Sequence, residues 1–406
     1  MRVLLAHKTF HVTGGGDLFF LETGRVLKER GHEVAWFSTA SPLNVPCDDP
    51  AVFVDPPDYV SGSALRRSAR LPGMIYSFEA ERRFSALLAD FRPDVVHAFA
   101  FQTHLTPSIL RAAKRAGVPV VVSCNDYKHV CPNYKLYHHG RVCTECRGRR
   151  FHRAVANRCC KDSLSFSAAS AAEAYVHRTL RVYERDVDRY LFASRFMARV
   201  TAWFWPERPL RWSLVRNPFA AAGPAAGKRG RHVLYFGRLV EEKGVDVLLR
   251  AAAAVPGLPL RVVGDGPLLG ELTEQAQALG LRDTRFVGPK WGAELDEYLD
   301  EARFVVVPSL WHENLPYVVL QAFAAGKAVV GSDRGGIPEL VEDGVRGSIY
   351  PAHDDEALAA ALRARWDDGA GTAAMGEEAA RHVAAEFSDD RFYASLMAAY
   401  EAVVLR

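Results

Sequence analysis

The chain has 406 residues, more than one hydrophobic core usually supports, so two domains are expected. Its hydrophobic fraction of 49% and charged fraction of 24% are typical of soluble globular proteins. No run of about 18 apolar residues occurs, which argues against a membrane-spanning helix. The amino terminus, MRVLLAHKTF, is too short and too polar for a signal peptide. We therefore expect a cytoplasmic protein whose seven cysteines are reduced or bound to metal.

Charge is distributed unevenly along the chain. Residues 1–217 carry 32 Lys and Arg against 20 Asp and Glu, a net charge of +12. Residues 218–406 carry 19 against 28, a net charge of −9. The asymmetry predicts different roles for the two halves, with anionic partners favoured by the first half. We expect no nucleic-acid partner.

The first half opens with a β-α-β pattern. An apolar strand at 2–6 is followed by a loop with Gly14, Gly15 and Gly16, a helix at 17–30 and a strand at 32–37. Glycines let the backbone approach a ligand, and Asp17 lies at a helix start that favours anions. Position 19 is Phe, so the dinucleotide fingerprint is not met. The loop is interpreted as a turn facing phosphate or acceptor, with an ordinary turn as the alternative.

Two further strands, at 94–98 and 118–123, end in polar residues. His97 lies at the end of the first, and Asn125 and Asp126 follow the second. The carboxyl edge of a parallel sheet is where ligands bind, so these three side chains are candidate site residues. The alternative for His97 is a structural histidine with satisfied hydrogen bonds.

Residues 61–91 are predicted to be helical and mix arginines with apolar side chains. Such a face is more often a solvated helix, and contact with the surface of an anionic membrane is the alternative. The residues concerned are Arg66, Arg67, Arg70, Arg82 and Arg83, with Leu65, Leu71, Ile75, Phe78 and Phe84 among them.

Five cysteines cluster in an insertion at about 128–161. Thiolates are good tetrahedral zinc ligands, and the Cys-x2-Cys pair is a usual half-site, so a structural zinc ion is predicted. An iron–sulfur centre and disulfides remain alternatives. The insertion also carries nine Lys and Arg against one acid, and so could shape an anionic acceptor site. Its candidate ligands are Cys131, Cys143, Cys146, Cys159 and Cys160.

After the Ala-, Gly- and Pro-rich stretch at 220–230, which has linker composition, strands and helices alternate again. Five strands are predicted, at 232–236, 260–263, 284–287, 304–307 and 328–331, and they indicate a second doubly wound sheet. Arg238 and Lys243 follow the first of these strands near a helix start. Two cations and backbone N–H groups there suit a diphosphate, although charged loop residues are often merely solvated.

The stretch 311–344, WHENLPYVVLQAFAAGKAVVGSDRGGIPELVEDG, follows the strand at 304–307. It places Glu313 before a helix that carries Gln321, and it ends in a strand and a Gly-Gly turn. Its polar groups therefore gather at the carboxyl edge of the second sheet, where ligands bind. Solvated polar side chains are the alternative.

Taken in order, GRLVEEKGVDVLL, VVGDGPL, FVGP and WHENLPYVVLQAFAAGKAVVGSDRGGIPELV resemble the retaining nucleotide-sugar glycosyltransferases of family 4. The glycine loop followed by RVLKERGHEV, and the strand DVVHA, extend the resemblance to most of the chain. It implies the α/β GT-B fold, with two doubly wound Rossmann-like domains facing a cleft. The domains would be 1–217 and 218–388, with a final helix at 389–406 crossing back to the first. The cysteine-bearing segment resembles an insertion of some bacterial members.

The resemblance also implies roles for matching positions. Arg238 and Lys243 would neutralise the donor diphosphate, Glu313 would bind sugar hydroxyls, and His97 would lie near the sugar. No divalent metal would be needed for catalysis, because two cations and a helix N-terminus serve that purpose. Further donor-binding positions are Gly15, Gly16, Gly237, Gly264, Asp265, Gly266, Asn314, Leu315 and Gln321. Gly14, Asp17, Asn125 and Asp126 would lie on the acceptor side.

Two positions depart from the family pattern. Gln321 stands where a second glutamate is expected to bind the ribose, and Phe99 stands where many members have a second histidine. A glutamine can accept one hydrogen bond and donate others, so donor binding with altered affinity is expected. The predicted activity is retaining transfer from a UDP- or GDP-sugar to an anionic, lipid-linked or small-molecule hydroxyl acceptor, with the protein peripheral on the inner membrane face. The alternatives are a sugar-nucleotide 2-epimerase and a non-catalytic sugar-nucleotide-binding subunit.

Overall fold

The computed structural model describes residues 1–47, 52–57, 72–207, 209–219 and 230–405. The chain divides into two compact units. Unit 1 comprises Met1–Leu136, Thr144–Pro218 and Phe392–Arg406, and unit 2 comprises Tyr137–Cys143 and Phe219–Arg391. The insertion expected at 128–161 is therefore divided, because its central hairpin belongs to unit 2.

Unit 1 is built on a parallel sheet of six strands in the order β2-β1-β3-β4-β7-β8. Buried aliphatic residues fill its central strands, as a sheet covered on both faces requires. The order reverses between β1 and β3, which is the topological switch point of this sheet. The strands are β1 (Arg2–His7), β2 (Glu33–Phe37), β3 (Val95–Phe99), β4 (Val120–Cys124), β7 (Arg189–Phe192) and β8 (Trp212–Leu214).

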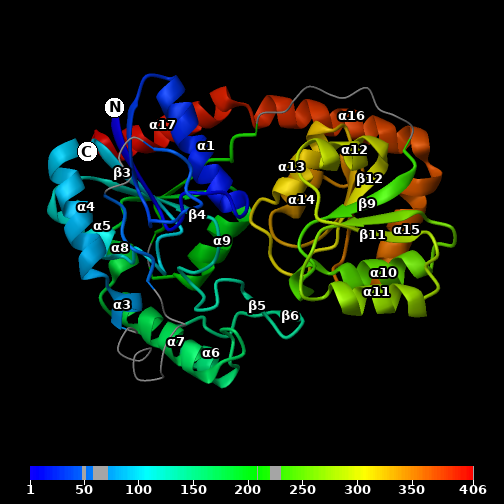
Figure 1. The fold of residues 1–406 in the computed structure, drawn as a ribbon, viewed down its shortest axis with the longest axis horizontal. Helices are drawn as coiled ribbons and strands as arrows, with labels where there is room; N and C mark the ends of the chain where they lie inside the picture. Colours follow the sequence, from blue (N-terminus) through cyan, green and yellow to red (C-terminus); the bar gives the residue numbers. More distant parts are fainter. Residues whose placement is uncertain (48–51, 58–71, 208, 220–229, 406) are drawn as a thin grey trace. The chain divides into compact units, whose positions relative to one another are not determined.

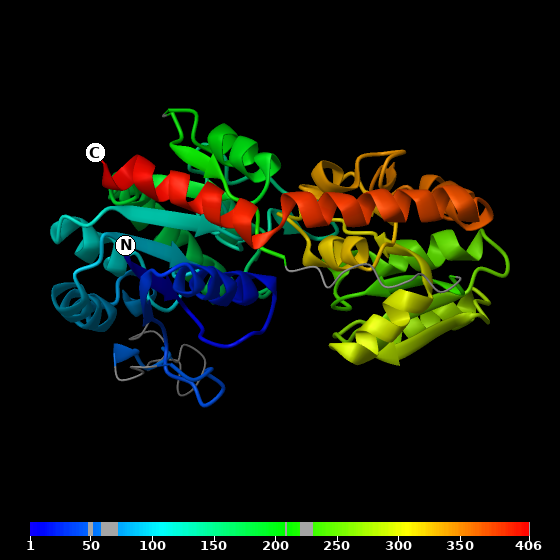
Figure 2. The same cartoon turned by 90° about the horizontal axis from the view of Figure 1, so that it is seen from above.

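Helices cover both faces of this sheet. One face packs against α1 (Gly15–Glu29) and α17 (Asp389–Val404), as Figures 1 and 2 show. Phe392, Leu396 and Tyr400 give α17 its buried stripe, so the amphipathic tail completes the core of unit 1. The opposite face carries α4 (Phe78–Phe91), α5 (Ser108–Arg115) and α9 (Arg195–Phe204). Other helices of the unit are α3 (Pro72–Ile75), α6 (His152–Ala156), α7 (Leu164–Thr179) and α8 (Val182–Arg185).

Unit 2 holds a second parallel sheet, in the order β11-β10-β9-β12-β13-β14. This is one strand more than predicted, because β14 follows the Gly-Gly turn and pairs with β13 at the edge. The switch point lies between β9 and β12. The strands are β9 (His232–Phe236), β10 (Leu260–Val263), β11 (Thr284–Gly288), β12 (Ala302–Val307), β13 (Val329–Ser332) and β14 (Gly347–Tyr350).

The helices of unit 2 again form two layers around its sheet (Figure 1). One layer contains α10 (Val245–Ala253), α11 (Leu269–Ala278) and α15 (Asp355–Asp367), whose apolar residues share one core. The other contains α12 (Ala293–Glu301), α13 (Tyr317–Ala324), α14 (Ile337–Val341) and α16 (Gly369–Glu386). A hairpin of β5 (Tyr137–His138) and β6 (Arg141–Val142) is also part of unit 2.

Two expectations about the first half are revised. Gly15 and Gly16 form the first turn of α1, not the loop before it. In the segment at 61–91, Phe84 packs into the core of unit 1 and so lies on neither a solvated nor a membrane-facing surface. Leu65, Arg66, Arg67, Arg70 and Leu71 lie outside the described residues, as does the stretch 220–229 of the expected linker. No helix within the described ranges is long and apolar enough to cross a membrane.

Candidate active site

The strongest candidate site lies in unit 2, at the switch point between β9 and β12. These two strands are hydrogen-bonded neighbours. After β9 the chain crosses over to β10 on one side of the pair, and after β12 it crosses over to β13 on the other side. The loop at 237–244 follows β9, and the loop at 308–316 follows β12. Leu310 N–H donates to the carbonyl of Glu242 at 2.9 Å, so the two loops are joined through their backbones. Ligands bind at such an edge in open α/β sheets.

Glycines permit the close approach of these loops. Gly244 has a φ of +68°, and a Cβ there would lie 2.1 Å from the carbonyl oxygen of Pro308. Gly335, after β13, has a φ of +63°, and a Cβ there would lie 2.0 Å from the carbonyl oxygen of Glu313. That oxygen accepts the N–H of Gly336 at 2.8 Å. Any larger residue at Gly244 or Gly335 would push apart the loops that hold the polar groups.

The central pair of the site is Lys243 and Glu313. Lys243 Nζ donates to Glu313 Oε1 at 2.6 Å, and Ser309 Oγ donates to the same oxygen at 2.7 Å. Glu313 is 5% exposed. Burial alone would raise the pKa of Glu313, but the Lys243 ammonium and the Ser309 hydroxyl outweigh it and lower the pKa below its usual value. An ionised carboxylate is thus held at the edge of the sheet, ready to accept hydrogen bonds.

Arg238 supplies a second, more accessible cation. Its side chain is 66% exposed, and Nη2 lies 3.7 Å from Oε1 of the buried Glu242. The backbone of its loop is held in place, because the hydroxyl of Tyr235 donates to the carbonyl of Arg238 at 2.8 Å. An exposed guanidinium beside a half-buried ammonium suits a diphosphate, which offers several oxygens to both.

The predicted donor-binding glycines lie at the same edge. Gly237 N–H donates to the carbonyl of Val263 at 3.0 Å, and a Cβ at Gly264 would lie 1.9 Å from the carbonyl oxygen of Gly237. Gly266 N–H is capped by the Asp265 carboxylate at 2.7 Å. These contacts bring the loop after β10 against the loop after β9.

The remaining donor-binding candidates belong to α13 and the loop that precedes it. Leu315 is buried, Asn314 is half-buried, and both lie just before the first turn of the helix. Gln321 lies half-buried on α13 itself, eight positions after Glu313. The N–H groups of a first helical turn favour anions, so this end of α13 adds to the positive character of the edge.

Sequence reasoning missed Tyr137, a buried residue of the β5–β6 hairpin. Its ring shares a core cluster with Leu239 and Leu310, which belong to the two loops of the site. Burial and the nearby Glu241 raise the pKa of the Tyr137 phenol. At the hairpin turn, a Cβ at Gly140 would lie 3.4 Å from Glu241 Oε1. The hairpin therefore packs beside the loop that carries Arg238 and Lys243. This hairpin was not predicted from the sequence, although a glycine between two short segments could have indicated a turn there.

In unit 1, the β1–α1 loop is closed by Asp17. Its carboxylate accepts from the Thr9 hydroxyl at 2.8 Å and from the Thr13 N–H at 2.9 Å, and it lies 3.5 Å from His7 Nε2. Burial raises the pKa of Asp17, but the hydrogen bonds from Thr13 and Thr9 lower it more strongly. Asp17 thus stabilises the conformation of the loop, and most of the hydrogen bonds that its carboxylate can accept come from within the protein.

The other candidates of unit 1, which include the predicted donor-binding residues Gly15 and Gly16, lie at the carboxyl edge of its sheet. A Cβ at Gly16 would contact Asn125 Nδ2 at 3.5 Å, so the start of α1 lies beside the loop after β4. Gly14 is exposed and caps α1, and Gly15 follows it. Asp126 accepts the N–H of Lys128 at 2.9 Å, and burial raises its pKa. Gly14, Gly15, Gly16 and Asn125 are therefore gathered at one edge.

His97 differs from its predicted role. The imidazole is fully buried, with Nδ1 2.8 Å from the Tyr400 hydroxyl and Nε2 2.8 Å from Ser123 Oγ. Burial lowers its pKa to about 3. Both nitrogens are engaged and no surface is exposed, so the geometry supports the structural alternative and not a contact with the sugar. The histidine instead links β3, β4 and α17 inside unit 1.

The five cysteines of the insertion do not form the predicted zinc cage. Within the ranges that the structure describes, no group of three or more His, Cys, Asp and Glu side chains could hold a metal ion. Cys131 Sγ donates to Asn133 Oδ1 at 3.0 Å, Cys146 packs with Cys159 in a small apolar cluster, and Cys160 N–H donates to Ser167. Cys143 ends the hairpin that belongs to unit 2. The zinc prediction therefore finds no support in the described residues.

Two family models together match almost the whole chain. The model described as glycosyl transferase 4-like domain matches residues 14–218, and the model described as glycosyl transferases group 1 matches residues 221–382. The D-inositol 3-phosphate glycosyltransferase of Salinispora tropica is 30% identical over 95% of this chain and 80% of its own length. The chain belongs to the family-4 glycosyltransferases.

Solved structures agree with this glycosyltransferase fold. Sucrose-phosphate synthase from Thermosynechococcus elongatus matches with a TM-score of 0.71 at 18% identity, over 98% of both chains. The Anabaena protein HepE, in complex with UDP and glucose, matches with a TM-score of 0.69 at 18% identity, over 99% of this chain and 100% of its own. The predicted pair of doubly wound Rossmann-like domains of a GT-B glycosyltransferase is confirmed.

Proposed function

We propose that this glycosyltransferase moves a sugar from a nucleotide-sugar donor to an acceptor hydroxyl with retention of configuration at the anomeric carbon. The observation that carries the proposal is the Lys243–Glu313 pair at the switch point of unit 2. There an ammonium, an ionised carboxylate and an exposed guanidinium lie on the two adjoining loops of one sheet edge. The two cations match the diphosphate of a nucleotide sugar, and the carboxylate matches the hydroxyls of its sugar.

The diphosphate would be held by Lys243 and Arg238. Phosphate oxygens are strong acceptors for charged donors, and two cations would offset the charge that grows on the leaving group as the sugar departs. The Lys243 ammonium donates one of its three N–H groups to Glu313, so two N–H groups remain for phosphate oxygens. The cations supply the charge neutralisation that divalent metals supply in other transferases.

Glu313 would orient the transferred sugar. Its pKa lies below the usual value, so it accepts hydrogen bonds at neutral pH and can take two sugar hydroxyls. In the transfer, the bond from C1 of the sugar to the leaving phosphate oxygen breaks. The acceptor oxygen bonds to C1 on the same face, and the acceptor proton passes to the leaving phosphate. No protein nucleophile is required, so the role of Glu313 is to bind and position.

The identity of both substrates is inferred from relatives and charge. HepE is a UDP-binding protein of the same fold, which favours a UDP-sugar over a GDP-sugar for this chain. The inositol-phosphate relative acts on a phosphorylated acceptor, and the first half of this chain carries a net charge of +12. Both support an anionic acceptor, presented in solution or at the inner face of a membrane.

A thermal-shift screen of UDP- and GDP-sugars tests the donor, since a ligand that binds only the folded state raises its stability. NMR of the product made from the best donor then tests retention. An α-linked product from an α-linked donor is expected, and a β-linked product would contradict retention.

Gln321 favours a second candidate, a non-catalytic sugar-nucleotide-binding subunit. The amide replaces a carboxylate expected to bind the ribose hydroxyls. Donor binding without release of nucleotide, for any donor that stabilises the protein, would support this candidate over the transferase.

A further inference from the structure

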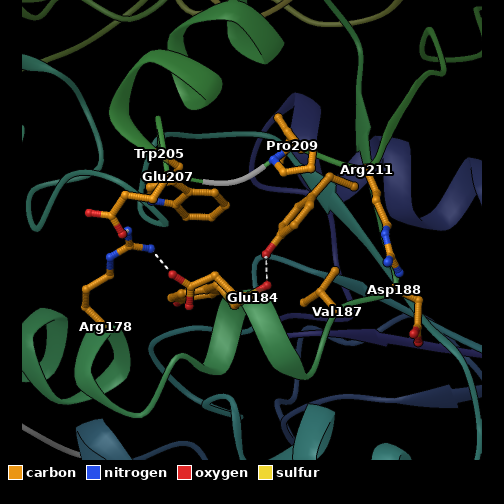
Figure 3. A pocket seen from close by; sticks show the side chains of 11 residues that line it. Arg178, Glu184, Val187, Asp188, Trp205, Glu207, Pro209 and Arg211 are labelled. Atoms are coloured by element: carbon orange, nitrogen blue, oxygen red, sulfur yellow. Dashed lines mark hydrogen bonds and ion pairs between the residues drawn. The ribbon is translucent and has the colours of Figure 1, made fainter.

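Unit 1 contains a pocket remote from its carboxyl edge. Its volume is about 360 Å³, and it lies between α7, α8, the end of α9 and the segments that lead into β7 and β8 (Figure 3). Asp188 directly precedes β7, and Arg211 directly precedes β8, so the pocket opens at the amino edge of the sheet. The glycine turn and Asn125 follow the carboxyl ends of β1 and β4 instead. The pocket therefore lies at the opposite edge of this sheet from the acceptor-side candidates of unit 1.

Aromatic side chains form one wall of this pocket. The rings of Tyr183 and Trp205 are stacked with centroids 6.3 Å apart, and the ring of Tyr190 meets Trp205 edge-on at 5.7 Å. The hydroxyl of Tyr190 donates to the backbone carbonyl of Tyr183, which holds the Tyr190 ring in place. All three rings are at least nine-tenths buried. All three line the pocket, and the Arg178 guanidinium lies 5.8 Å from the centroid of the Trp205 ring.

Paired charges form the other walls. Arg178 forms ion pairs with Glu184 and, at 3.4 Å, with Glu207 (Figure 3). Asp188 is held by Lys114 at 2.8 Å. The described lining residues thus carry three carboxylates and two guanidiniums, and each of the carboxylates already has a cation beside it. Among the described lining residues neither sign of charge clearly prevails, which favours a neutral ligand over an ion. A paired carboxylate still has free lone pairs, and these accept hydroxyl protons.

We propose that this pocket is a non-catalytic binding site for a neutral saccharide. The C–H face of a sugar ring would pack on the aromatic wall around Trp205, and the carboxylates and Arg211 would exchange hydrogen bonds with its hydroxyls. The volume lies within the range of about 300–1,000 Å³ that small-molecule pockets occupy. The inference goes beyond the proposed transfer reaction. A glycan chain held here would stay near the enzyme while its end reacts elsewhere.

Saturation-transfer NMR and calorimetry on the full chain test the proposal with three neutral disaccharides, maltose, cellobiose and lactose. Glucuronic acid and glucosamine serve as anionic and cationic probes. At least one neutral disaccharide is expected to bind more tightly than either charged sugar. Glu207→Ala and Arg211→Ala should each weaken that binding about tenfold, as the loss of a charge-assisted hydrogen bond predicts. Glu33→Ala, which removes another largely exposed carboxylate of unit 1, should leave it unchanged.

The proposal is overturned if no neutral disaccharide binds, if a charged sugar binds more tightly, or if both pocket variants bind like the parent protein. The last result would place the sugar in another part of the chain. Nucleotide release from the donor should be the same in Glu207→Ala as in the parent protein. The saccharide site and the transfer reaction can thus fail separately, because the first is scored by sugar binding and the second by donor turnover.

Discussion

Lys243 donates a hydrogen bond of 2.6 Å to Glu313, and the pair joins the loop after β9 to the loop after β12. The two residues lie 70 positions apart, yet they share one oxygen-to-nitrogen contact at the switch point of the sheet. A buried carboxylate is costly without a cation, so the pair fixes the geometry of the edge before any donor arrives. Preorganised charge of this kind is what a transferase needs at its leaving group.

The first prediction concerns the stability of this pair. Lys243→Met should lower the free energy of unfolding by about 3 kcal/mol, because it leaves the Glu313 carboxylate buried without its cation. Glu313→Gln removes that charge and should cost less. In the double variant much of the cost of Lys243→Met should disappear. Denaturant unfolding of the four proteins gives the coupling energy, and additive effects would show that the pair is not coupled in solution.

A second prediction concerns the pH dependence that His97 imposes. Its folded pKa of about 3 lies below the unfolded value of 6.5, because burial disfavours the charged ring. Below pH 6.5 the His97 side chain is therefore protonated in the unfolded chain but stays neutral in the folded protein. The free energy of unfolding consequently falls as the pH decreases toward about 3. The slope from this one group approaches about 1.4 kcal/mol per pH unit.

Unfolding curves of the parent protein and His97→Gln, compared between neutral and acid pH, measure this slope. The variant should be less stable at neutral pH, since Tyr400 and Ser123 lose their partner, but it should lose less stability on acidification. His139→Gln, an exposed histidine, is the control for the removal of one histidine. Parallel curves for the parent and His97→Gln would refute the assignment of His97 as a buried neutral residue.

The third prediction concerns Gln321. Gln321→Glu should tighten binding of a UDP-sugar by roughly three- to tenfold, since a carboxylate can accept hydrogen bonds from both ribose hydroxyls and an amide oxygen offers less. Calorimetric titration measures the change. Gln275→Glu, on α11, is a matched control that adds the same charge within unit 2 and should have no effect. Weaker binding in Gln321→Glu would mean that position 321 does not face the ribose.

The fourth prediction concerns the hairpin at Tyr137–Cys143. Tyr137→Ala should destabilise unit 2 by about 3 kcal/mol, because it removes a buried ring. It should also raise the donor KM more than it lowers kcat, since the ring packs beside the loop with Arg238 and Lys243. Tyr134→Ala removes an exposed tyrosine from the same insertion and should do neither. If the Tyr137→Ala variant folds and its KM for the donor is unchanged, the hairpin has only a structural role.

The alternation of apolar strands and helices was sufficient to predict both sheets, because buried parallel strands are continuous apolar runs with sharp ends. The gathering of Lys243 and Glu313 was also predictable, since loops that follow neighbouring parallel strands meet at one edge. The buried, structural position of His97 was not predictable, because its hydrogen-bond partners lie 26 and 303 positions away in the sequence. The position of Tyr137 was not predictable either, since the sequence of an insertion does not indicate which of the two sheets the insertion packs against.

The central claim is that Lys243, Arg238 and Glu313 form the donor site, and titration with UDP and a UDP-sugar tests it most directly. The parent protein should bind both ligands. Lys243→Ala and Arg238→Ala should weaken UDP binding about tenfold or more, as the loss of a charge-assisted hydrogen bond to phosphate predicts. Glu313→Gln should retain UDP binding but lose the extra affinity for the sugar. UDP binding that is unchanged in Lys243→Ala and Arg238→Ala would contradict the account.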